Sequence, residues 1–150
     1  MTIFHVPENK KQYLDLLLLA DEQEDMIDRY LDKSTLFALE DDGKVLGVCA
    51  VVEINEGKDL EIKNLATDES VHGKGYGKKL VHFVRDHYFG QYDHLYVGTG
   101  DSPLTVPFYE KCGFVRSHSL KNFFIDNYDH PIFECGIQLI DMVYLRMPLK

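Results

Sequence analysis

VHGKGYGKKL, residues 71–80, is the segment that decides the fold of this 150-residue chain. It follows a run of strand-forming residues, Leu60–Thr67, and opens a helical pattern that starts at Tyr76. Its three glycines carry no Cβ atom and leave backbone N–H groups open to close approach. The helix N-terminus behind them carries a partial positive charge, and the lysines add more. The segment therefore predicts a strand–loop–helix unit that binds a phosphorylated ligand.

The spacing of the glycines excludes two common phosphate-binding loops. A P-loop needs GxxxxGK followed by Ser or Thr. Here Gly77-Lys78 is followed by Lys79, and His72 stands five positions before Gly77. A dinucleotide fingerprint, GxGxxG, would place Lys78 or Leu80 where its third glycine belongs. The ligand is therefore expected to be phosphorylated but bound by a different loop.

The rest of the chain predicts a mixed α/β fold in one domain, residues 1–150. We expect strands at Ile3–Val6, Thr35–Glu40, Lys44–Asn55, Leu60–Thr67, His94–Gly98, Phe114–Leu120 and Ile137–Met147. We expect about four helices: one after Pro7, one around Met26–Leu31, one from Tyr76 to a stop at Gly90, and one at Val106–Lys111 with Thr105 as N-cap. Lys121–Gly136 is expected to be irregular. The sheet should be mostly antiparallel, with one parallel crossover between the fourth and fifth strands.

Two motifs together resemble the GNAT superfamily of acyl-CoA-dependent N-acetyltransferases. The pyrophosphate loop of that family reads Gln or Arg, two residues, Gly, one residue, then Gly or Ala; Gly75 and Gly77 stand at the glycine positions, and His72 replaces the Gln or Arg. The segment Phe108–Phe114, FYEKCGF, resembles a family segment found about thirty residues downstream of the loop. Ser102 stands where the family often has Asn. The resemblance implies a GNAT-like fold.

The resemblance also implies acetyl-CoA as the acyl-donor cosubstrate. In the family the strand before the loop and the strand after its helix splay apart, and the pantetheine arm lies between them. The residues that this places against the donor are Leu65, Ala66, Thr67, His72, Gly73, Lys74, Gly75, Tyr76, Gly77, Lys78 and Ser102. A backbone N–H at the end of the splayed strand would polarise the thioester carbonyl.

The resemblance implies direct attack of an amine on the thioester, with Tyr109 as the group that stabilises the departing thiolate. A tyrosine that only packs its ring in the core is the alternative reading of Tyr109. An alkyl amine is protonated at neutral pH, so a carboxylate or a histidine is needed near the splay. Glu61 and Glu53 are the candidate bases because they lie on the strand leading to the loop and on its neighbour. Glu134 and Asp141 are further candidates in the tail of the chain.

The charge of the chain indicates which partners it favours. Its net charge of −9 argues against nucleic-acid binding. An acidic cluster on the first two helices consists of Asp21, Glu22, Glu24, Asp25, Asp28 and Asp32. The cluster favours a cationic acceptor, either a small amine or a protein or peptide amine; a solvated helix face is the alternative reading.

Three cysteines without a CxxC pair indicate free thiols in a reducing compartment, and we expect a cytoplasmic protein. No apolar run is long enough to span a membrane, and no signal peptide is evident. The histidines show no metal-binding spacing, so no metal site is expected. The oligomeric state stays open, with a homodimer as one option. Two alternatives to an enzyme also stay open: a non-catalytic acyl-CoA-binding sensor or interaction module, and a nucleotide-binding module.

Overall fold

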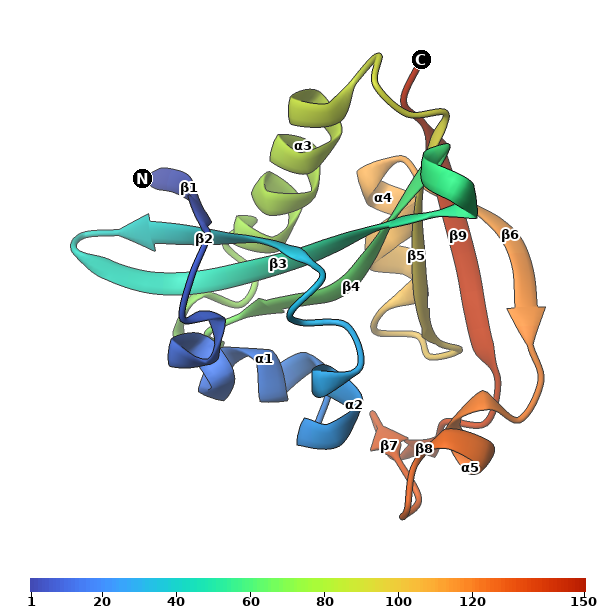
Figure 1. Cartoon of the computed structure of the whole chain (residues 1–150). Helices are drawn as coiled ribbons and strands as arrows, with labels where there is room; N and C mark the ends of the chain where they lie inside the picture. Colours follow the sequence, from blue (N-terminus) through green and yellow to red (C-terminus); the bar gives the residue numbers. More distant parts are fainter.

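A seven-stranded mixed sheet forms the centre of the molecule in the computed structural model, which describes residues 1–150 (Figure 1). The strand order is β1-β2-β3-β4-β5-β9-β6. The strands are β1 (Thr2–Val6), β2 (Thr35–Asp41), β3 (Lys44–Ile54), β4 (Asp59–Thr67), β5 (His94–Gly100), β6 (Val115–Leu120) and β9 (Met142–Pro148). All neighbours pair antiparallel except β4 and β5, which are parallel. The predicted mixed α/β sheet with one parallel crossover is confirmed.

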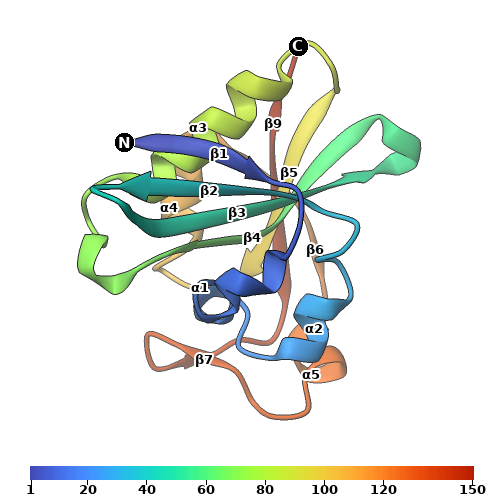
Figure 2. The same ribbon diagram turned by 60° about the vertical axis from the view of Figure 1, so that its left-hand side comes forward.

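Helices cover both faces of this sheet (Figure 2). They are α1 (Leu14–Ala20), α2 (Glu24–Asp28), α3 (Tyr76–Tyr88), α4 (Val106–Cys112) and α5 (Phe123–Asn127). Leu80, Val81 and Val84 of α3 join the larger core cluster on one face, together with the inner side of α4. Leu17 of α1 and Ile27 of α2 belong to a second cluster on the other face. None of the helices combines the length and the apolar character needed to cross a membrane.

A bulge in β4 changes which face its side chains occupy. The register with β3 pairs Ala50 with Asn64 but Val51 with Ile62, so Lys63 is the extra residue. Before the bulge, Ile62 points into the core beside α3; after it, Asn64 hydrogen-bonds on the α1 side. Leu65 packs on the α3 side.

The parallel ladder between β4 and β5 is short. It pairs Leu60 with Leu95, Glu61 with Tyr96 and Ile62 with Val97, and it stops there. From Lys63 to Thr67, and from Gly98 to Gly100, the two strands have no ladder with each other. Figure 1 shows the two halves of the sheet diverging at this point. The molecule is therefore split open at the carboxyl ends of two adjacent parallel strands.

The tail of the chain differs from the sequence prediction. The stretch predicted as irregular contains α5 and β7 (Phe133–Glu134), which forms a hairpin with β8 (Ile137–Gln138). The predicted single strand Ile137–Met147 is wrong, because the chain bends between β8 and β9. Leu139 turns inward to pack with Phe124 and Ile132 in a small third cluster, and Asp141 accepts a hydrogen bond from the Asn122 N–H.

Two smaller differences concern helix starts. The helix predicted after Pro7 begins at Leu14, because Asn9 has a left-handed backbone conformation and a 3₁₀ turn over Lys10–Tyr13 follows it. Thr105 precedes α4, but its side chain does not cap the helix. Its hydroxyl donates to the Gly100 carbonyl instead, at 3.1 Å.

Candidate active site

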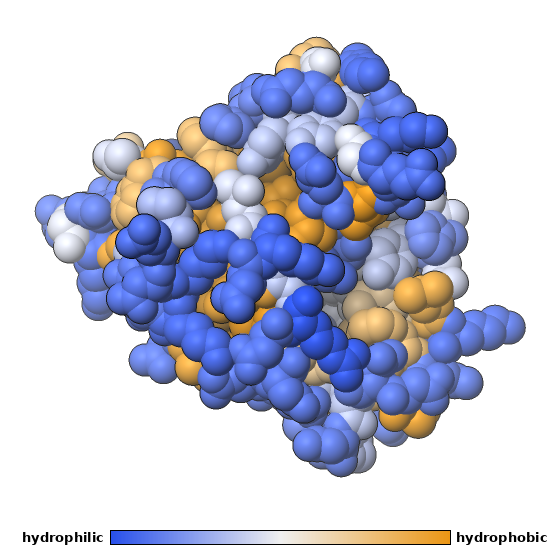
Figure 3. Space-filling view, in the orientation of Figure 1, coloured by the Kyte–Doolittle hydropathy of each residue, from blue (hydrophilic) through white to orange (hydrophobic).

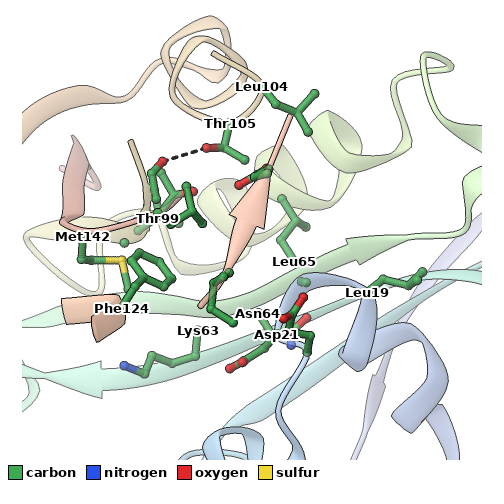
Figure 4. Close-up of a pocket in the computed structure, with 18 of the residues that line it drawn as sticks. Leu19, Asp21, Lys63, Asn64, Leu65, Thr99, Leu104, Thr105, Phe124 and Met142 are labelled. Carbon is green, nitrogen blue, oxygen red and sulfur yellow. Dashed lines mark hydrogen bonds between the residues drawn. The ribbon is translucent and has the colours of Figure 1, made fainter. Parts of the chain in front are cut away.

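Two adjoining cavities occupy the split in the sheet. The first, here called the loop cavity, is about 610 Å³ and lies between the end of β4, the glycine loop (residues 71–78) and α4. The second, here called the tail cavity, is about 430 Å³ and lies between β4, β5, the end of α1 and the tail segment (residues 121–141). Figure 4 shows the tail cavity with Leu65 and Thr105 on its wall. Leu65, Thr105 and Tyr109 line both cavities, so the two cavities adjoin at these residues.

The glycine loop presents backbone to the loop cavity. Gly73 and Gly75 have φ of 80° and 83°, a left-handed conformation that favours glycine, and nothing lies within 4 Å of where a Cβ atom would be. Gly75 is the N-cap of α3, so the first N–H groups of that helix have no partner within it. His72 donates from Nε2 to the Thr67 carbonyl at 3.1 Å and thereby ties the loop to the end of β4. The loop can therefore bind an anion through backbone N–H groups.

Gly77 has a different structural role from the one that its motif position suggests. A Cβ atom there would lie 3.2 Å from the Phe108 ring, which is closer than most real contacts. The glycine lines the loop cavity, and it also lets α3 approach α4 closely. Its lack of a side chain therefore serves helix packing as well as access to the cavity.

Tyr109 stands where the two cavities meet. Its ring packs edge-on against Phe108 and Phe114, with centroids 5.0 and 5.6 Å away, and the residue is 8% exposed. No protein group hydrogen-bonds to its hydroxyl. Burial is the main cause that raises the pKa of Tyr109, so the hydroxyl keeps its proton at neutral pH and can donate a hydrogen bond.

Most of the predicted donor-binding residues line the loop cavity. They are Leu65, Ala66, Thr67, His72, Gly73, Gly75, Tyr76, Gly77 and Lys78. Lys74 is exposed and lines neither cavity. Ser102 is buried below the start of α4, where its Oγ accepts from the N–H groups of Leu104 and Thr105 at 3.2 and 3.4 Å. Its hydroxyl thus serves the turn before α4.

Neither of the two predicted base candidates lines a cavity. Glu61 is 7% exposed and lies 3.4 Å from the Lys63 ammonium. Glu53 pairs with Leu60 at the far end of β4, and it accepts a hydrogen bond from Tyr92 at 2.6 Å. That bond is the main cause that raises the pKa of Tyr92 to about 12. Glu53 and Glu61 therefore lie outside the walls of both cavities.

Other carboxylates do line the tail cavity: Asp21, Glu22 and Glu134. Asp21 accepts hydrogen bonds from Tyr128 at 2.8 Å and from Tyr30 at 3.4 Å. Burial raises the pKa of the Asp21 carboxyl, and the two tyrosine hydroxyls oppose that rise. Burial also raises the pKa of Glu134, against a hydrogen bond from Ser102. Asp21 is thus held at a defined place in the wall.

The acidic cluster predicted from sequence divides into parts with different partners. Lys11 pairs with Glu24 and Asp28 at 2.8 and 2.7 Å, so these two carboxylates are held by a cation on the surface. Figure 3 shows this face as largely hydrophilic. Glu22 lines the tail cavity and pairs with His130 of the tail segment at 2.9 Å. Asp21 alone of the six is embedded in a hydrogen-bond network beneath the tail segment.

Sequence reasoning did not single out Asn64 or Tyr128, although both line the tail cavity. The sequence could have indicated a role for Asn64, because a buried amide within a strand needs a hydrogen-bond partner. It donates from Nδ2 to the Leu17 carbonyl and to the Tyr30 hydroxyl, both at 3.0 Å. Tyr128 had no such signal, since its contact with Asp21 spans 107 residues of sequence.

Comparison with known proteins identifies the family. Residues 4–114 match the family model described as the Acetyltransferase (GNAT) family. The chain belongs to the GNAT family of acetyltransferases. It is 36% identical over 145 residues to the uncharacterised N-acetyltransferase YvbK of Bacillus subtilis (strain 168), which covers 95% of this chain and 92% of that protein.

Two solved GNAT structures share the whole fold. A GNAT family acetyltransferase from Elizabethkingia anophelis with acetyl-CoA bound superposes with a TM-score of 0.91 at 34% identity, over 98% of this chain and 97% of that chain. An acetyltransferase from Bacillus subtilis in complex with CoA gives a TM-score of 0.87 at 34% identity, over 97% of both chains. The enzyme class predicted from the sequence, an acyl-CoA-dependent acetyltransferase, is confirmed.

Proposed function

We propose that this GNAT acetyltransferase moves the acetyl group of acetyl-CoA directly to the nitrogen of an amine bound in the tail cavity. The observation that supports this most directly is that the loop cavity and the tail cavity adjoin in the split and share Leu65 and Tyr109 in their walls. A donor held on one side and an acceptor held on the other would meet at those two residues. Bringing the reactants together in this way makes the step effectively unimolecular.

The loop cavity suits acetyl-CoA as donor. The glycine loop and the open N-terminus of α3 would hold the pyrophosphate, with Lys78 adding positive charge. The backbone of Leu65, Ala66 and Thr67 has no ladder with β5, so its polar groups on that side are free for the pantetheine arm. A backbone N–H there would polarise the thioester carbonyl and stabilise the oxyanion that forms during attack.

The reaction balances as follows. The acceptor arrives as an ammonium and loses one proton, which costs roughly 4–5 kcal/mol at pH 7 for an alkyl amine of pKa ~10.4. Its nitrogen then bonds to the carbonyl carbon, the carbon–sulfur bond breaks, and the electron pair leaves with sulfur as thiolate. The nitrogen loses its second proton as the amide forms. The thiolate takes up one proton and the other is released to solvent.

Tyr109 would donate a hydrogen bond to the departing thiolate. Burial raises the pKa of its hydroxyl above that of a free thiol, so complete proton transfer to sulfur is uphill. A hydrogen bond needs no such transfer, and it stabilises charge that develops only as the carbon–sulfur bond breaks. This is the role that a partnerless, protonated hydroxyl at the junction of the two cavities supports.

Release of CoA thiol in the presence of an amine panel tests the proposal. We expect turnover with at least one primary amine, and an N-acetyl product formed in equal amount to the thiol. Thiol release without acetylated product would indicate hydrolysis and contradict direct transfer to the amine. Tight acetyl-CoA binding with no turnover on any amine would favour the non-catalytic sensor instead.

A further inference from the structure

Asp21 occupies an unusual place in the wall of the tail cavity. It follows the last residue of α1, and its carboxylate lies beneath the tail segment. Tyr128 donates to one carboxylate oxygen and Tyr30 to the other, so the group is held from two sides. Figure 4 shows Asp21 close to Asn64 of β4, and Tyr30 hydrogen-bonds to both. The carboxylate is therefore fixed at a defined point beside the split.

No cation of the protein pairs with this carboxylate. Lys63 is the only basic residue in the cavity wall, and its ammonium lies 3.4 Å from Glu61 instead. The wall carries three carboxylates against this one lysine. A partly buried negative charge is costly unless a positive charge neutralises it. The cavity is therefore electrostatically suited to a cationic ligand.

Asn64 adds an unpaired acceptor to the same wall. The residue is 3% exposed, and its Oδ1 has no hydrogen-bond partner, although Nδ2 makes two bonds. Buried polar atoms without partners are rare in folded proteins. An ammonium group carries three N–H donors, and so it could bond to the Asp21 carboxylate and to a reoriented neighbouring amide together.

The remaining wall is apolar. Phe124 and Tyr128 stack with centroids 5.6 Å apart, and Ile132, Leu139 and Met142 lie near them. The tail segment covers this part through Tyr128 and through the bond of the Asp129 N–H to Gln23. The tail segment covers this cavity of about 430 Å³. The cavity therefore has room for a small molecule rather than for a protein chain.

We propose that Asp21 binds the ammonium of the acceptor, and that the acceptor is a small primary amine with an apolar or aromatic body. This inference rests on the proposed acetyl transfer to an amine and names the group and the substrate class. Glu22 and Glu134 are less suited to the role. Glu22 already pairs with His130, and Glu134 contacts Ser102 on the side near Tyr109.

The test compares two matched variants in steady-state kinetics with 2-phenylethylamine and acetyl-CoA. Asp21→Asn keeps the shape of the side chain but removes the charge, and its one amide oxygen can accept from one of the two tyrosines. We expect KM for the amine to rise about tenfold or more, with KM for acetyl-CoA unchanged. Asp25→Asn makes the same chemical change on an exposed residue with no ion pair, and it should alter neither constant. An unchanged KM for the amine in folded Asp21→Asn would overturn the assignment.

A second measurement needs no variant. Calorimetry on the wild-type protein with CoA present compares 2-phenylethylamine with neutral 2-phenylethanol, and we expect about tenfold tighter binding of the amine. Equal affinities would overturn the role of charge. Faster acetylation of spermidine or of a lysine peptide than of 2-phenylethylamine would overturn the substrate class. Failure of the proposed function looks different, because wild-type protein would then acetylate none of these amines.

Discussion

The chemical role of Tyr109 can be separated from its packing role, because the ring and the hydroxyl have different surroundings. Its ring is fixed by Phe108 and Phe114, whereas its oxygen bonds to no protein group. We expect Tyr109→Phe to keep the fold and the affinity for acetyl-CoA, and to lower kcat by about 10²-fold or more, since only the donor to the thiolate is lost. Single-turnover rates of product formation check this, and the melting shift caused by acetyl-CoA serves as the control. An unaltered single-turnover rate would reduce Tyr109 to a packing role.

At the scale of the element, β4 shows which structural features the sequence predicts and which it does not. The strand, the loop and α3 were predictable because strand formers, three glycines and a helical period follow one another directly. The face on which Glu61 lies was not, because strict alternation puts Glu61 and Leu65 on one face. The bulge at Lys63 breaks that alternation. Glu61 therefore lies among polar partners away from the cavities. No local sequence pattern predicts the bulge.

The tail segment was unpredictable for another reason. Its three short elements, α5, β7 and β8, have little intrinsic stability, and the contacts that hold the segment come from residues about a hundred positions earlier. Tyr128 bonds to Asp21 and His130 pairs with Glu22, so the segment is fastened to the turn between α1 and α2. These two contacts shape the tail cavity, and no local sequence pattern predicts either of them.

The attachment of the tail segment should depend on pH. Hydrogen bonds to Asp129 and then to Glu22 raise the pKa of His130 above its ordinary value of 6.5. A raised folded-state pKa means that the pair stabilises the attachment fully below about pH 6.5 and is lost as the pH rises through the raised value. Amide hydrogen exchange in residues 121–141 should therefore gain protection at low pH, after correction for the intrinsic exchange rate.

His130→Gln is the control for this pH dependence. It removes the titrating group, so corrected protection of the tail segment should become flat across the same pH range. Glu22→Gln removes the carboxylate through which His130 reaches the turn between α1 and α2, and it should flatten the dependence as well, because the remaining partner, Asp129, belongs to the tail segment itself. A pH dependence that survives His130→Gln in full would show that another group controls the attachment.

At the scale of the whole molecule, the split divides the sheet into two halves. The strands β1 to β4 pair with the strands β5, β9 and β6 only through the three-residue ladder of β4 and β5. The backbone groups of β4 beyond Ile62 that face β5 have no strand partner. A pantetheine arm lying in the split would supply those partners and join the halves. Binding of acetyl-CoA should therefore stabilise the molecule as a unit.

This stabilisation can be measured and located. At a hundred times its Kd, a ligand that binds only the folded state contributes about 2.7 kcal/mol, which for a domain of this size corresponds to about 5–10 °C in Tm. We expect such a shift with acetyl-CoA and none with ATP at equal concentration, because ATP has phosphates but no arm to fill the split. Hydrogen exchange should show new protection in residues 63–67 and 98–100. Equal shifts with both ligands, or protection confined to the glycine loop, would mean that the loop recognises phosphate alone and that the split does not hold the donor.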